Sequence, residues 1–124
     1  MASLNRVQLI GRLGRDPEMR YTPKGTPSTR FSLAADHSWT NPEGQRQTQT
    51  DWVNIEAWAK LGEICQQYLK KGRLVYVEGR LHTDRWEDDK GETQYMTKVI
   101  ATGMQMLDRK PEEQDEPEAG EFEQ

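Results

Sequence analysis

Cysteine and long apolar runs are nearly absent from this sequence of 124 residues. Cys65 is the only cysteine, which excludes an intrachain disulfide and a metal site built from several cysteines. No stretch approaches the roughly 20 apolar residues that cross a bilayer. The first residues also show no long apolar run followed by a small-residue cleavage site. We therefore expect a soluble protein of the cytoplasm without membrane contact.

Apolar residues are scarce as well, at 33% of the chain, and the cations are unevenly distributed. The formal net charge is −4, yet all 17 lysines and arginines lie in residues 1–110. Residues 111–124 contain seven acids, no lysine or arginine, and no hydrophobic periodicity. The sequence therefore predicts one folded, mildly basic domain over residues 1–110 and a disordered acidic tail over residues 111–124. This asymmetry suits a polyanionic partner.

Residues 50–60, TDWVNIEAWAK, are the most informative stretch, because their side chains alternate as in a β-strand. The predicted core face contains Val53, Ile55, Ala57 and Ala59. The predicted solvated face contains Trp52, Asn54, Glu56, Trp58 and Lys60. Flat rings beside a cation on a wet sheet suit unpaired nucleobases on a phosphate backbone. The alternative is that both rings pack beneath a loop or against another subunit.

Hydrophobic periodicity predicts further strands before and after this stretch. Alternation predicts strands over residues 4–13, 29–39, 73–86 and 94–107, with a short strand over residues 18–22. Residues 40–50 contain no apolar side chain and are predicted to form an exposed hairpin loop. Residues 61–69 have helical spacing, with Cys65 on the core side and Lys70, Lys71 and Gly72 closing the helix. The order predicts an all-β fold: a five-stranded OB barrel with one α-helix between strands 3 and 4.

Alternation also assigns faces to the last two of these strands. Val75, Val77 and Leu81 are predicted to share a core face, with Trp86 on the opposite, polar face. In the last strand, Met104 and Met106 are predicted on the face opposite to Val99.

Several segments in sequence order resemble a known family. These segments are NRVQLIGRLGRDPEMRYTPKG, FSLAADHSW, TDWVNIEAWAKLGEICQQYLKKG, VYVEGRLHTDRW and TGMQML. Over residues 4–107 the chain resembles bacterial single-stranded-DNA-binding proteins. The resemblance implies an OB barrel that assembles as a homotetramer and binds single-stranded DNA without sequence preference. It implies a role in replication, recombination and repair near the nucleoid, without a catalytic residue, a metal or another cofactor.

The resemblance also implies which residues touch DNA. The tryptophans that match base-stacking positions of the family are Trp39, Trp52, Trp58 and Trp86. The cations that match phosphate-contacting positions are Arg20, Lys60, Lys70, Lys71 and Arg85. Asn54, His82 and Asp84 stand where other members often have basic residues, which weakens phosphate contact there. Alternation selects three of the tryptophans independently, whereas Trp39 shares the face of Phe31 and needs a twist or bulge to reach the others.

Assembly and protein partners follow from the resemblance alone. The family's subunit contact runs through the first strand and the outer sheet, where Val7, Leu9 and Tyr76 are candidates. Family tails usually dock replication and repair proteins through an aspartate run capped by Ile-Pro-Phe. This tail ends GEFEQ, with the single aromatic Phe122 among glutamates. Its acidity fits the family, whereas its docking tip is atypical.

Two other functions remain open from the sequence. An enzyme could hold Mg²⁺ at Glu87, Asp88 and Asp89, although adjacent carboxylates on a glycine-containing turn usually form a solvated loop. His37 and His82 have no partner at metal-ligand spacing, and no pairing of a base with a nucleophile is evident. An OB adaptor for RNA or for a replication-restart complex is the other alternative. We expect a protein without enzymatic activity.

Overall fold

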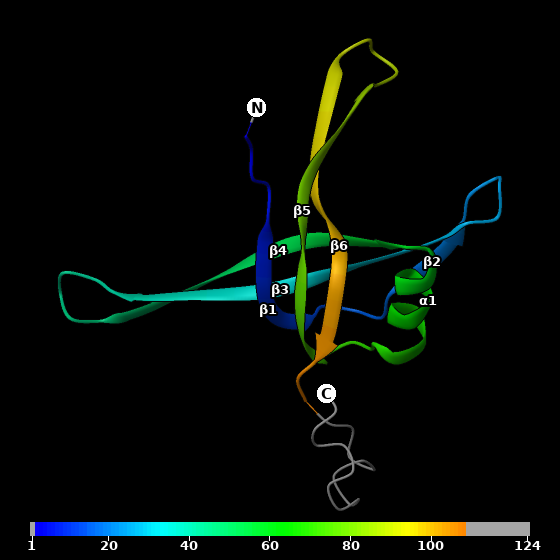
Figure 1. The fold of residues 1–124 in the computed structure, drawn as a ribbon. Helices are drawn as coiled ribbons and strands as arrows, with labels where there is room; N and C mark the ends of the chain where they lie inside the picture. The colour runs from blue at the N-terminus through cyan, green and yellow to red at the C-terminus, as the bar shows by residue number, and fades with distance from the viewer. Residues whose placement is uncertain (1, 109–124) are drawn as a thin grey trace, which may run out of the picture.

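The computed structural model describes residues 2–108, in which strands close into a barrel with one helix packed against it (Figure 1). In chain order the elements are β1 (Val7–Leu13), β2 (Glu18–Tyr21), β3 (Pro27–Thr40), β4 (Arg46–Trp58), α1 (Ala59–Tyr68), β5 (Leu74–Glu87) and β6 (Thr93–Met106). The strands form one sheet in the order β1-β5-β6-β4-β3-β2, and β1 also pairs with β3. That last pairing closes a ring of five strands and leaves β2 at its edge, so the predicted five-stranded barrel is confirmed.

The helix α1 connects β4 to β5, which are the third and fourth strands of the ring in chain order. The position predicted for the helix is therefore confirmed. Two strands meet β1 at once, since Arg12 pairs with Ala34 of β3 and with Leu74 of β5. A side chain at Gly11 would collide with the carbonyl oxygen of Ala34, so this seam needs a glycine.

The barrel interior is lined by aliphatic side chains that alternate along their strands. The largest of those that are essentially inaccessible are Leu33, Ile55, Val75, Val77 and Val99. Cys65 projects from α1 into the same cluster with 0% of its surface exposed, and burial raises its pKa to about 12. The predicted core thiol is confirmed.

Two long hairpins extend beyond the barrel, the β3–β4 arm and the β5–β6 arm (Figure 1). The predicted loop over residues 40–50 is wrong for most of its length, because β4 begins at Arg46 and pairs with Thr40 at the arm's end. Outside the barrel both faces of a two-stranded ribbon meet water, so no apolar alternation marks the strand. For the same reason Leu81 is 49% exposed, although it shares the face of Val77 as predicted.

A register shift corrects the faces predicted for β6. Glu78 pairs with Gly103 and Gly79 pairs with Ala101, so Thr102 is an extra residue in β6. An extra residue reverses the side-chain faces beyond it. Met104 and Met106 therefore pack against the core together with Val99 instead of opposite to it.

The ends of α1 also differ from the prediction. The helix ends at Tyr68, and its C-cap Leu69 has an extended backbone. Gly72 adopts a positive φ of 89° in a separate turn, where its N–H donates to the carbonyl of Leu13. At the other end, Ala59 begins the helix with a positive φ of 55° and is exposed, so it is not on the predicted core face. The chain turns there from strand to helix, which interrupts alternation.

Residues 2–108 bear only in part on the predicted absence of a membrane span, and not at all on the predicted acidic tail. Within residues 2–108 no helix has both the length and the apolar character needed to cross a membrane. The acidic tail predicted over residues 111–124, including Phe122, lies outside the described residues.

Candidate nucleic-acid interface

Three tryptophans lie on the outward side of β4 and β5. Trp52 and Trp58 alternate with the core residues of β4 and are 60% and 39% exposed. Trp86 of β5 is 46% exposed and lies on the same face as Asp84, two positions before it, whose carboxylate is bridged to β4 as described below. We call this surface, formed by the outward side chains of β3, β4, β5 and β6, the outer face. The rings are open to solvent in the single chain, so they are not sealed beneath a loop.

Trp39 lies on the other side of the β3–β4 arm. The β3–β4 register runs unbroken from Ser28 opposite Trp58 to Thr40 opposite Arg46, without the bulge that was one predicted way for Trp39 to change faces. Trp39 is 40% exposed because the arm has left the barrel at that point, and its ring stacks on His37 with centroids 5.5 Å apart. By alternation it faces away from Trp52.

The Trp52 ring rests on a glycine. A Cβ placed on Gly14 would lie 2.5 Å from Cζ3 of Trp52 and 3.4 Å from the hydroxyl oxygen of Ser32. Gly14 follows β1, and its N–H donates to the carbonyl of Ser32 at 3.1 Å, which fixes it beneath the ring. The missing side chain at Gly14 therefore sets how Trp52 lies on the outer face.

The prediction for Glu56 is wrong, because its side chain is only 2% exposed although it lies on the outer face. Lys98 of β6 covers it, with Nζ 2.6 Å from Oε1 of Glu56 and 2.8 Å from Oδ2 of Asp84. On β3, the Ser28 hydroxyl and the Nε of Arg30 both donate to Oε2, at 3.0 and 3.2 Å. This ion-pair network ties β3, β4, β5 and β6 together and crosses the outer face between Trp58 and Trp86.

The network keeps both of its central groups charged. Burial alone would raise the pKa of Glu56, but the hydrogen bonds from Lys98 and Ser28 outweigh it and hold that pKa below its usual value. Burial would likewise lower the pKa of Lys98, and its contacts with Asp84 and Glu56 instead raise it. The positive charge of Lys98 is therefore compensated within the protein, unlike that of an exposed lysine.

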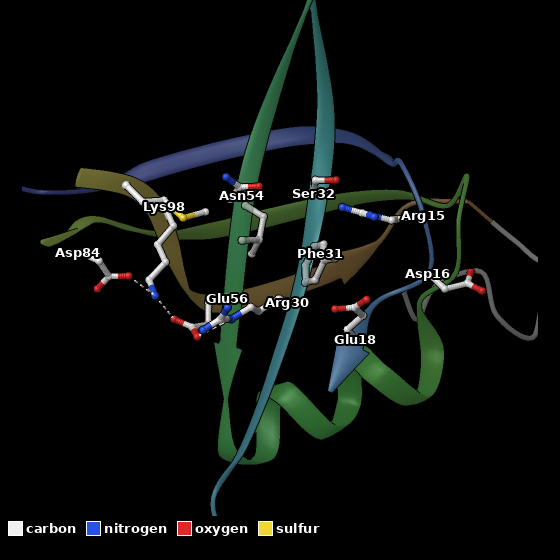
Figure 2. A pocket seen from close by; sticks show the side chains of 12 residues that line it. Arg15, Asp16, Glu18, Arg30, Phe31, Ser32, Asn54, Glu56, Asp84 and Lys98 are labelled. Carbon is white, nitrogen blue, oxygen red and sulfur yellow. Dashed lines mark hydrogen bonds and ion pairs between the residues drawn. The ribbon is translucent and has the colours of Figure 1, made fainter. Parts of the chain in front are cut away.

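A pocket of about 200 Å³ opens on the outer face beside this network (Figure 2). Its floor is β3 and β4, where Ser32 and Asn54 are register partners. The segment after β1 contributes one wall, and Lys98 with Asp84 stands at the other. Three cationic and four acidic side chains line the pocket, so it offers no excess of positive charge.

The predicted cations do not gather at this pocket. Arg20 of β2 is exposed and 4.0 Å from Glu18. Lys60 is the second residue of α1, and Lys70 and Lys71 follow its end; all three are exposed. Arg85 is exposed but pairs with Tyr95 in the β5–β6 arm, and alternation directs it away from Trp86. The structure thus places Trp52, Trp58 and Trp86 on one face, and it leaves the predicted cations outside the pocket.

Three charged side chains on the outer face were missed by sequence reasoning: Arg15, Arg30 and Lys98. Arg30 and Lys98 do follow strand alternation as polar, outward residues, which was the available signal. Their pairing with Glu56 joins residues 26 and 42 positions apart, which alternation within one strand does not reveal. Arg15 lies in the segment between β1 and β2, where no periodicity applies.

The candidate magnesium site is a structured turn. The Asp88 carboxylate accepts the backbone N–H groups of Glu92 and Lys90 and the side-chain amide of Gln94, and the pKa of Asp88 is lowered by these bonds, most by that from Glu92. Among residues 2–108 the structure gathers no group of three or more histidine, cysteine or acidic side chains suited to a metal ion.

Known proteins are similar to this chain in sequence and in fold. The family described as "Single-strand binding protein family" matches residues 4–107. The chain is 50% identical over 108 residues to "Single-stranded DNA-binding protein 1" of Chlorobaculum tepidum, covering 86% of this chain and 67% of that protein. It is 48% identical over 105 residues to "Single-stranded DNA-binding protein" of Neisseria meningitidis, covering 85% of this chain and 60% of that protein. The match thus spans about two thirds of the length of these relatives.

A solved structure described as "Plasmodium falciparum SSB complex with ssDNA" superposes on the chain with a TM-score of 0.81. The two are 32% identical, and the superposition covers 87% of this chain and 98% of the other.

Proposed function

The chain belongs to the single-strand binding protein family, and from this premise we propose that it binds single-stranded DNA through its outer face. The observation that carries the proposal is the set of exposed indoles on one sheet surface, Trp52, Trp58 and Trp86. Stacking on an aromatic ring is worth about 1–3 kcal/mol per base and accepts any base, because every base has a π-face. Duplex DNA keeps its base faces stacked inside, so it should compete poorly.

The phosphate backbone is held by exposed cations that lie outside the pocket. The candidates are Arg20, Lys60, Lys70, Lys71 and Arg85, all exposed. Each phosphate neutralised on a single strand releases counterions and changes the logarithm of the affinity by about −0.7 per logarithm of salt concentration. Lys98 is not among them, because its charge is already compensated by Glu56 and Asp84.

The direct test is titration with oligo-dT while tryptophan fluorescence is recorded. We expect strong quenching at low salt that weakens as salt is added, because bases stack on the exposed indoles while phosphate contacts are screened. Duplex DNA of equal length should quench little. An unchanged emission spectrum at low salt and saturating oligo-dT would overturn the proposed function.

Replacing Gly14 by alanine should displace the Trp52 ring without unfolding the protein. The new methyl group meets the outer end of the exposed Trp52 indole, and Gly14 has no positive φ that a side chain would strain. We expect oligo-dT affinity to fall by about fivefold or more, as for loss of one weak stack, with a near-unchanged melting temperature. Gly103→Ala is the matched control, since a Cβ there meets nothing within 4 Å and φ is also not positive. Equal affinity of the two variants would contradict this role for Gly14.

Assembly and cellular role complete the proposal. We place the chain in a homotetramer that serves replication, recombination and repair at the nucleoid, without catalysis of its own. Val7 and Leu9 of β1 pack partly against the core, and Tyr76 of β5 accepts a hydrogen bond from Gln8 beside them. Because Val7 and Leu9 pack against the barrel's own core, Tyr76, on the outward side of the sheet, is the candidate that supports a subunit contact along β1. Sedimentation velocity measures the stoichiometry, and a monomer at micromolar concentration would contradict the tetramer. Protein partners recruited through the atypical tail are a separate matter, tested by pull-down with and without residues 111–124.

A further inference from the structure

The two stacking rings of β4 are too far apart to hold neighbouring bases. Trp58 is six positions after Trp52, and a strand rises about 3.3 Å per residue, which places the rings' backbone positions about 20 Å apart. The outward residues of β4 between them are Asn54 and Glu56. Nucleotides that bridge the two rings therefore pass over the pocket, without an indole of β4 beneath them.

On one side of this pocket the polar side chains pair with one another, and on the other side they are unpaired. Glu56, Lys98 and Arg30 satisfy one another at its closed side. On the other side, the side chains of Ser32, Asn54 and Arg15 have no hydrogen-bond or ion-pair partner among residues 2–108. Figure 2 shows Asn54 and Ser32 adjacent on the floor, with the guanidinium of Arg15 pointing toward them from the wall. Unpaired donors and acceptors thus gather at one place.

The chemistry of these free groups favours a base edge over a phosphate. Four acidic side chains line the pocket against three cations, and the two cations of the network are already paired. An asparagine amide pairs with N6 and N7 of adenine, and an arginine guanidinium pairs with O6 and N7 of guanine. The atom common to both pairings is N7, which purines have and pyrimidines lack.

We propose that the pocket formed by Ser32, Asn54 and Arg15 receives the N7 edge of one purine base from the nucleotides that lie between the Trp52 and Trp58 stacks. This inference rests on the proposed function and adds to it a base preference at one position of an otherwise sequence-tolerant surface. Asn54 is the adenine reader, Arg15 is the guanine reader, and Ser32 supports either one.

The test compares oligonucleotides that differ only at N7. One is a mixed dT/dA oligomer, and the other carries 7-deaza-adenine, which keeps the stacking surface and replaces N7 by C–H. We expect the wild type to bind the dA oligomer about three- to tenfold more tightly, at the low end for a bidentate contact because Asn54 is exposed. In Asn54→Leu the ratio of the two affinities should approach one. The same comparison with dG, 7-deaza-guanine and Arg15→Gln tests the second reader.

The control and the contrary outcomes are defined separately from those of the proposed function. Gln66→Leu changes an exposed amide on α1, away from the pocket, and should keep the wild-type ratio. Circular dichroism confirms that each variant is folded. If the wild type binds oligo-dT yet binds both dA oligomers equally, the purine site is overturned while single-strand binding stands. If Asn54→Leu retains the wild-type ratio, Asn54 is not the reader.

Discussion

Trp52→Ala combined with Trp58→Ala should weaken oligo-dT binding by about 30-fold or more. Two stacks contribute at least about 2 kcal/mol together, and every 1.4 kcal/mol is tenfold in affinity. Neither ring is part of the buried core, so the free energy of unfolding should change by less than about 1 kcal/mol. Fluorescence anisotropy with labelled oligo-dT measures the affinity, and urea denaturation measures the stability.

The comparison variant for the tryptophans is Tyr68→Ala. Tyr68 is an aromatic of similar exposure, 41%, but it lies on α1 away from the outer face. Its loss should leave affinity within about twofold of wild type. A large loss of stability with unchanged affinity in the double variant would mean that the rings serve packing instead, for example against another subunit.

Lys98→Met should lower the free energy of unfolding by about 2–4 kcal/mol, the largest stability effect that we expect from one outer-face residue. Breaking a buried ion pair leaves its partner uncompensated, which typically costs about 3–5 kcal/mol. Glu56 would keep Arg30 and Ser28, so the expected cost is near or below the lower limit. Adding Glu56→Gln to Lys98→Met should recover part of the loss, because the unpaired charge is then removed. An additive double variant would exclude the coupling.

The ion pair of Glu56 with Lys98 also predicts that the stability of the fold depends on pH in the acid range. The folded-state pKa of Glu56 lies below its ordinary value of 4.5. Its contribution to stability is therefore complete above that ordinary value and is lost as pH falls through the folded-state pKa. The wild type should lose stability more steeply than Glu56→Gln below pH 4.5. Glu63→Gln, an exposed acid on α1, should follow the wild-type profile.

Alternation within single strands predicts much of the structure from the sequence alone. It located the core through Ile55, Val75 and Val77, and it selected Trp52, Trp58 and Trp86 as outward rings. These inferences succeed because a strand that closes a barrel has one face sealed and the other wet. The helix containing Cys65 was also predictable, since its apolar residues have helical spacing while those of the neighbouring strands alternate.

The failures have physical causes that one strand does not encode. Alternation predicts that Glu56 is solvated, but Lys98 of β6 covers its carboxylate in the folded barrel. One extra residue at Thr102 moved Met104 and Met106 to the core. The β3–β4 arm has water on both faces, so its sequence resembles that of a loop. In each case tertiary pairing decided what local pattern left undetermined.

Cys65 gives the protein a practical property. Thiol reagents attack the thiolate, and this thiol is both inaccessible and shifted to a pKa of about 12. We therefore expect the folded chain not to react with maleimides. A cysteine introduced at the tip of either arm would be the single reactive site, so a dye there could report how the arm moves when a strand engages it.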